Sequence, residues 1–78
     1  MPKLRRLSGR EVVILLQRAG FVIVRVRGSH HILKLGECSV TAPVHGNDSL
    51  PIGTLKKIYT DAVACASEDQ IRPLFYTE

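Results

Sequence analysis

The sequence predicts a small α+β domain in which a three-stranded antiparallel sheet is covered on one face by two helices. Three observations support this. A helix with a marked start and stop spans about residues 9–19, three apolar strands joined by glycine-first turns fill residues 22–42, and a second helical pattern runs to about residue 64. The element order is therefore α-β-β-β-α, and a chain of 78 residues has room for one domain.

A capping box marks the start of the first helix. Ser8 and Glu11 stand at S-x-x-E spacing, which lets the serine oxygen accept from the Glu11 amide while the carboxylate accepts from the Ser8 amide. Apolar residues then recur at helical spacing, namely Val12, Leu15, Leu16 and Ala19. Gly20 is a typical residue after a helix end, so we expect the helix to stop there.

Two glycine-first pairs, Gly28-Ser29 and Gly36-Glu37, predict two-residue type II′ hairpin turns and hence a meander of three strands. The first turn places Arg27 opposite His30, and strict alternation then places Val24 opposite Leu33. The face predicted to form the core contains Val22, Val24, Val26, His31, Leu33, Leu35, Cys38, Val40 and Ala42. The opposite, open face contains Ile23, Arg25, Arg27, His30, Ile32, Lys34, Ser39 and Thr41.

The rest of the chain predicts the second helix and a short tail. Pro43 ends the meander, and residues 50–54 lead into a helix with Leu55, Ile58 and Ala62 facing inward. Another capping-box pattern, from Ser67 to Gln70, predicts a short final helical turn. We expect one domain over residues 1–78, with a core at 7–64 and a C-terminal extension at 65–78. This arrangement resembles the double-stranded-RNA-binding domain.

Charge is distributed unevenly along the chain. Residues 1–34 contain eight Lys and Arg against one Glu, a balance of +7, whereas residues 35–78 contain three against six Asp and Glu, a balance of −3. A basic half of this kind favours a polyanionic partner, with nucleic acid ahead of an anionic membrane surface. A solvated basic surface without a partner is the simpler alternative.

Several classes of protein are excluded at this stage. The apolar runs are far shorter than the roughly 20 residues that a membrane helix needs, and the basic N-terminus does not lead into a signal-peptide pattern. Cys38 and Cys65 have neither a metal-site nor a disulfide-framework spacing, so we expect two free thiols that pack as small apolar groups. Together these features predict a cytoplasmic protein without a membrane partner.

His30 is the candidate catalytic residue, because side-chain parity places it on the open face among cations. Arg27 lies across the hairpin, and Arg25 and Lys34 lie one step away on the same face. These charges disfavour a protonated imidazole, so we expect a neutral ring that can act as a general base near neutral pH. The same cations are suited to hold a phosphodiester. A solvated surface histidine is the alternative.

The other candidate residues have weaker support. His31 points toward the core, where a hydrogen-bonded structural histidine is the commoner outcome, and His45 lies in the loop after the third strand. Because His30 and His31 face opposite sides of one strand, we expect no metal site. Lys56 and Lys57 on the second helix are equally compatible with phosphate contacts and with a solvated helix face. Aromatic residues are too few to predict a base-stacking platform.

Five segments together resemble the HicA-type mRNA interferase toxins of bacterial toxin–antitoxin pairs, over about residues 7–64. They are Leu7-Ser8-Gly9-Arg10-Glu11, Ala19-Gly20-Phe21, the hairpin from Arg25 to His31, the segment from Val40 to Gly46, and Pro51-Ile52-Gly53-Thr54-Leu55. The resemblance implies a double-stranded-RNA-binding-like fold, a functional histidine in the Gly28-Ser29-His30 element, RNA cleavage without a metal or other cofactor, and silencing by a HicB-type antitoxin. Some relatives have the histidine one place later, at His31 here. The tail from Ile71 to Tyr76 has no counterpart.

The leading hypothesis is therefore an endoribonuclease toxin that cleaves mRNA. His30 would take the proton of a ribose 2′-OH, while Arg25, Arg27 and Lys34 offset charge on the phosphoryl oxygens. Gly28 and Ser29 complete the predicted RNA-binding set, together with Lys56 and Lys57. The sequence does not identify the group that protonates the leaving oxygen, for which His31, His45 and water are the candidates. A non-catalytic RNA-binding module and a domain for an acidic protein partner are the alternatives.

Overall fold

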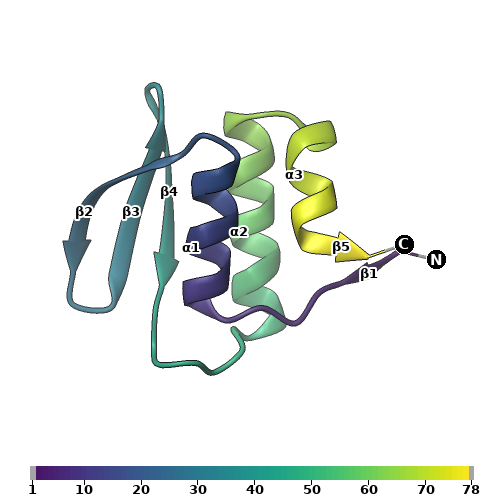
Figure 1. Cartoon of the computed structure of the whole chain (residues 1–78), viewed down its shortest axis with the longest axis horizontal. Helices are drawn as coiled ribbons and strands as arrows, with labels where there is room; N and C mark the ends of the chain where they lie inside the picture. Colours follow the sequence, from purple (N-terminus) through teal and green to yellow (C-terminus); the bar gives the residue numbers. More distant parts are fainter. Residues whose placement is uncertain (1, 78) are drawn as a thin grey trace.

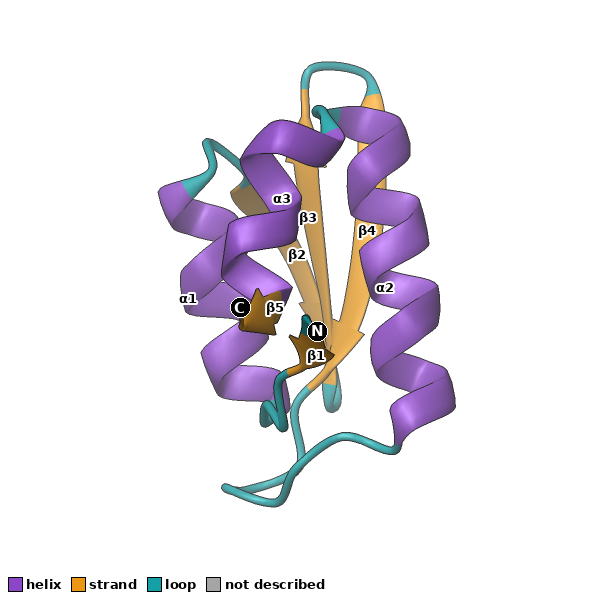
Figure 2. Ribbon diagram, turned by 90° about the vertical axis from the view of Figure 1, so that its right-hand side faces the viewer, coloured by secondary structure: helices purple, strands orange, loops and turns teal. Residues whose placement is uncertain are grey.

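The helices and strands form three layers, with the main sheet on one side, two helices in the middle and a third helix on the far side (Figures 1 and 2). The computed structural model describes residues 2–77. Its elements are β1 (Lys3–Leu4), α1 (Gly9–Arg18), β2 (Val22–Arg27), β3 (His30–Leu35), β4 (Cys38–Pro43), α2 (Ile52–Cys65), α3 (Glu68–Phe75) and β5 (Tyr76–Thr77). The predicted α+β class is confirmed, including the antiparallel order β2-β3-β4 and the placement of α1 and α2 on one face of that sheet.

The start of α1 is the predicted capping box. The Glu11 amide donates to Ser8 Oγ at 3.2 Å, and the Ser8 amide donates to Glu11 Oε1 at 2.9 Å. Gly9 lies so close to the backbone of Pro43 and Val44 that a Cβ atom at this position would overlap the Pro43 carbonyl oxygen. The N-terminus of α1 is therefore packed directly against the end of β4.

The register of the meander confirms both predicted turns but not the strict alternation along β2. Arg27 lies opposite His30, and Leu35 lies opposite Cys38. Between these ends, a bulge at residue 24 makes Ile23, rather than Val24, the partner of Leu33. The extra residue reverses the faces of the residues that precede it.

This bulge overturns part of the predicted core face. Val22 and Val24 are exposed and Ile23 packs partly buried against the core, which is the reverse of the prediction. Val26 keeps its predicted face opposite His31 but is exposed near the end of the outermost strand. The prediction holds for β3 and β4, where Leu33, Val40 and Ala42 are buried.

The two cysteines form a disulfide, so the prediction of free thiols is wrong. Cys38 at the start of β4 and Cys65 at the end of α2 are bonded, with their Cα atoms 5.4 Å apart. The helix α2 packs on β4, and this packing brings together two residues that are 27 positions apart in the sequence. The spacing of the two cysteines in the sequence does not indicate this contact.

The C-terminal segment is longer and more deeply packed than the predicted short turn. The helix α3 has eight residues, begins at the predicted cap Ser67, and buries Ile71 and Phe75 completely. After it, β5 pairs antiparallel with β1, so the two ends of the chain lie side by side (Figure 1). Among residues 2–77, no helix is both long and apolar enough to cross a bilayer.

Candidate nucleic-acid interface

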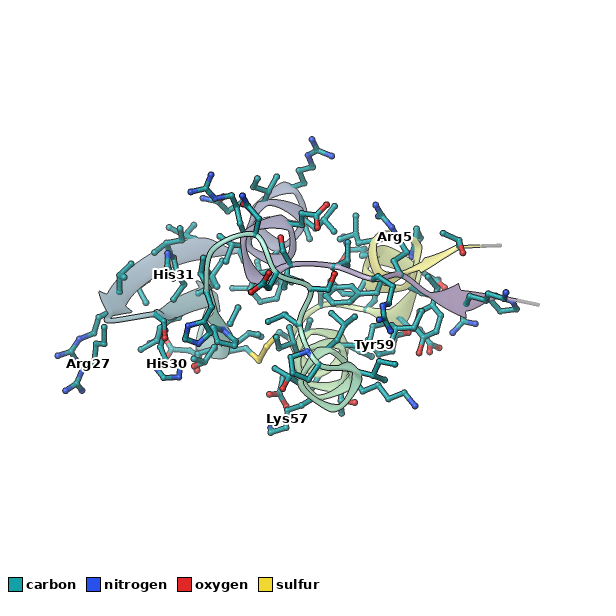
Figure 3. The ribbon with its side chains drawn as sticks, turned by 90° about the horizontal axis from the view of Figure 1, so that it is seen from below. Arg5, Arg27, His30, His31, Lys57 and Tyr59 are labelled. Carbon is teal, nitrogen blue, oxygen red and sulfur yellow. A yellow bond between two sulfur atoms is a disulfide. The ribbon has the colours of Figure 1, made fainter. Side chains whose placement is uncertain are left out.

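His30 lies at the tip of the β2–β3 hairpin, as the first residue of β3. It is exposed and lies directly opposite Arg27 in β2 on one side and Pro43 in β4 on the other. The turn before it depends on Gly28, whose φ of 57° suits glycine, while Ser29 keeps a negative φ. Figure 3 shows His30 and Arg27 at this end of the molecule, with His31 on the opposite side of the strand.

The open face of the sheet places further cations behind His30. Arg25 lies opposite Ile32, and Lys34 lies opposite Val22 and Ser39, so both basic side chains are on the face that the helices leave uncovered. Arg25, Arg27 and Lys34 are all exposed. Within residues 2–77 the one ion pair joins two residues of α2, so these sheet cations have no carboxylate partner there. The face is free to bind anions.

His31 lies on the helix side of the sheet, opposite Val26 and Ala42, and is partly buried. Its Nδ1 is 3.4 Å from the carbonyl oxygen of Ser29, a long hydrogen bond of the structural kind that the sequence predicts. The two neighbouring histidines therefore have different environments, and only His30 faces the cations.

The loop after β4 lies at the same end of the sheet as the hairpin tip. The Val44 amide donates to the Ser29 carbonyl oxygen at 2.7 Å, which ties the loop to the turn that precedes His30. His45 follows directly and is exposed. The sequence allows this loop to approach the open end of the hairpin but does not reveal the hydrogen bond. The register set by the Gly36 turn places Pro43 beside His30.

Lys56 and Lys57 are exposed on α2, in the helix layer rather than on the sheet. The Nζ of Lys57 is 3.0 Å from Asp61 Oδ2, in an exposed pair one helical turn apart. Pairs of this kind contribute little to stability and are screened by salt, so an anion can replace the carboxylate. The structure thus leaves these lysines available but separates them from the sheet cations.

The hollow at the surface of α1 contains none of the predicted site residues. Arg5, Leu7, Glu11, Ile14, Leu15 and Arg18 line it. His30 and the sheet cations instead form an open surface, which suits an extended polymer better than a small molecule that must be enclosed.

Aromatic residues do not contribute to this surface. Tyr59 packs edge-on against Phe75 and Tyr76, with ring centroids 5.5 and 5.1 Å away, where α2 meets the C-terminal segment. Burial there raises the pKa of Tyr59. Within residues 2–77 no three side chains of the metal-ligating types His, Cys, Asp and Glu come together.

The fold and the comparison with known families identify the class of protein. The α-β-β-β-α core is that of double-stranded-RNA-binding-like domains. The family model of the HicA toxin of bacterial toxin–antitoxin systems matches residues 9–63, which is more than half of the chain. The chain therefore belongs to the HicA toxin family. A comparison with curated proteins returned no match.

Proposed function

We propose that this chain is an endoribonuclease that cleaves mRNA and uses His30 as its general base. The observation that supports this most directly is the register at the hairpin tip, where exposed His30 lies opposite Arg27 and shares a face with Arg25 and Lys34. A proton acceptor beside unpaired cations is what a phosphodiester cleavage through the 2′-OH requires. Family membership supports the same reaction class.

In the proposed reaction, an imidazole nitrogen of His30 takes the proton of a ribose 2′-OH. The freed oxygen attacks the adjacent phosphorus, the bond from phosphorus to the 5′ oxygen breaks, and the leaving oxygen takes up a proton. Arg25, Arg27 and Lys34 offset the negative charge that grows on the phosphoryl oxygens. The product ends in a 2′,3′-cyclic phosphate, without participation of a metal.

The proton for the leaving oxygen comes from His45 or from water. His31 is the weakest of the three candidates, because it lies on the helix side of the sheet and its Nδ1 contacts the Ser29 carbonyl oxygen. His45 is exposed in the loop that Val44 ties to the hairpin tip. At the hairpin tip Gly28 has no side chain to keep a phosphate from the backbone, and the Ser29 hydroxyl can donate a hydrogen bond to it.

A nuclease of this kind must be restrained in its own cell, and we propose a HicB-type antitoxin as its partner. The cations that attract phosphates also attract carboxylates, so an acidic antitoxin surface over Arg25, Arg27 and Lys34 would cover His30 as well. Inhibition then works by occupying the substrate surface.

The experiment compares His30→Ala with His45→Ala and His31→Asn, an asparagine being able to keep a polar group near the Ser29 carbonyl. Cleavage of a labelled mRNA is measured alongside affinity for a 2′-O-methyl RNA that cannot react. Loss of a general base costs about 100-fold or more in rate, so His30→Ala should lose cleavage and keep affinity.

Two results would separate the alternatives. Cleavage that survives His30→Ala undiminished would remove His30 from the reaction. RNA binding without any cleavage by the wild-type chain would favour the non-catalytic RNA-binding module.

A further inference from the structure

Exposed aliphatic side chains are concentrated on a single strand of this protein. Val22, Val24 and Val26 in β2 are 62%, 52% and 53% exposed, whereas the other two large exposed aliphatic residues among residues 2–77 lie apart on α1 and α2. Scattered exposed aliphatic residues are ordinary, but three on one strand are a concentration. The bulge divides them between the two faces of the sheet, because Val22 lies opposite Lys34 on the open face and Val26 lies opposite His31 on the helix side. What they share is the strand itself. The proposed reaction uses none of these valines.

The strand that bears them is also one of the two edge strands of the sheet. The strand order β2-β3-β4 leaves the outer side of β2 without a neighbouring strand in the described part of the chain. Unpaired backbone N–H and C=O groups along an exposed edge can accept an additional strand, and alternate side chains then provide specificity. Edge strands are commonly protected by charged residues, especially Lys, by Pro or by bulges. The sequence from Val22 to Arg27 has neither Lys nor Pro, and beyond the bulge at residue 24 the residues from Arg25 to Arg27 pair regularly with β3, so this part of the strand offers a regular edge.

The charged residues of the edge strand are both positive. They are Arg25 and Arg27. The sequence has no acidic residue between Glu11 and Glu37. An incoming strand is therefore stabilised if it presents carboxylates among its apolar side chains.

We propose that the outer edge of β2, formed by the three valines with Arg25 and Arg27, binds an extended acidic segment of a partner protein by strand addition. The segment's apolar side chains would cover the valines, and its carboxylates would lie near the arginines. This contact shares Arg25 and Arg27 with the antitoxin surface proposed above and adds the valines and the backbone edge of β2, and it holds whether or not His30 cleaves RNA.

Two other occupants fit the edge less well. RNA can bind the arginines, but its phosphates and sugars offer little apolar surface to cover three valines. A second copy of this chain would bring a second set of arginines to the same place, so the two edges would repel each other.

The test selects binders from a phage-displayed library of random dodecapeptides against the full chain, and then measures the affinity of the enriched peptides as synthetic probes. The variant replaces all three valines, Val22→Thr, Val24→Thr and Val26→Thr, because threonine keeps the β-branched shape and removes apolar surface. Ile52→Thr, at an exposed position that starts α2, is the matched control. Circular dichroism and thermal melting establish that each variant is folded.

The expected peptides alternate apolar and acidic residues. They should bind the triple variant about tenfold more weakly and the Ile52→Thr control unchanged. Amide hydrogen exchange of residues 22–27 should slow on binding. The triple variant should still cleave RNA, so failure of this proposal and failure of the proposed reaction are distinguishable.

Several outcomes would overturn the proposal of strand addition at β2. One is enriched peptides that lack acidic residues or bind the triple variant as tightly as the wild type. Another is exchange protection that lies outside β2. Sedimentation that shows a dimer of the wild type, lost in the triple variant, would assign the edge to a second copy. A weaker affinity of the triple variant for 2′-O-methyl RNA would assign it to RNA.

Discussion

Gly9 determines how closely α1 can approach the sheet. A Cβ atom at this position would overlap the backbone of Pro43, the residue that pairs with His30. A helix residue far from the hairpin in sequence thus helps to fix the strand beside the candidate base. Alanine normally stabilises a helix relative to glycine. Whether Gly9→Ala raises or lowers the unfolding free energy therefore tests how closely the helix is packed.

We expect Gly9→Ala to destabilise the protein by about 1–3 kcal/mol, because the overlap with a rigid backbone outweighs the gain in helix propensity. Gly53 in α2 is the matched control, since a Cβ atom there meets no atom within 4 Å. Gly53→Ala should be neutral or stabilising by up to about 1 kcal/mol. Urea unfolding of both variants measures the difference, and a stable Gly9→Ala would contradict the close packing.

The position of His30 was predictable from the sequence because it depends on local information alone. The Gly28 turn fixes the pairing of Arg27 with His30, and no residue intervenes between the turn and that pair. Val22 and Val24 were assigned to the wrong face because the prediction extended strict alternation through a bulge. The bulge has no sequence marker here, since residue 24 is a valine like the residues two positions before and after it.

At the scale of the element, the start of α1 depends on the charge of Glu11. The backbone amide of Ser8, and then its side chain, hold the pKa of Glu11 below its ordinary value of 4.5 by hydrogen bonding, and the charge of Arg5 adds to this. A carboxyl group whose pKa is lowered by folding stabilises the folded state above the ordinary pKa, and this contribution is lost as pH falls through the lowered value.

Glu11→Gln tests this dependence, because glutamine can still accept from the Ser8 amide but has no charge. We expect the wild type to be more stable than the variant at about pH 7, and the difference in unfolding free energy to be smaller at a pH well below the ordinary value of 4.5. Urea unfolding at the two pH values gives the comparison. Glu37→Gln, at an exposed turn position, controls for the general effect of removing a negative charge. A difference that persists undiminished at low pH would contradict the role of the charge.

The disulfide joins two further elements, β4 and α2. Cross-linking residues 27 positions apart restricts the unfolded chain, which corresponds to about 3–4 kcal/mol in the loop-entropy account. We expect dithiothreitol to lower the unfolding free energy of the wild type by up to this amount. The double variant Cys38→Ala, Cys65→Ala should show the lower stability and no response to the reductant. A wild type that does not respond would show that the bond contributes nothing in solution.

At the scale of the whole molecule, the chain extends the family core with a third layer. The family model ends at residue 63, yet Ile71 and Phe75 are completely buried, and β5 pairs with β1 near the N-terminus. The Ser67 cap was visible in the sequence, because capping is local. The β1–β5 pair was not, because two-residue strands have no periodicity and their contact joins opposite ends of the chain.

The difference between local features and contacts of distant segments also explains what could be predicted about the candidate site. The histidine, the hairpin and the cations are close in sequence, and both turns that align them could be identified. The link from Val44 to Ser29 and the disulfide depend on how β4 packs, which only the folded chain determines.

Cleavage through the ribose 2′-OH without a metal is the reaction that the proposed role of His30 requires, and it is tested most directly with a single modified substrate. A labelled RNA is compared with the same RNA containing one 2′-deoxynucleotide at the mapped cut site, with and without excess EDTA. We expect the unmodified RNA to be cut equally in both conditions and to end in a 2′,3′-cyclic phosphate, and we expect no cut at the deoxy position. Cleavage at the deoxy position, or loss of cleavage with EDTA, would contradict this reaction.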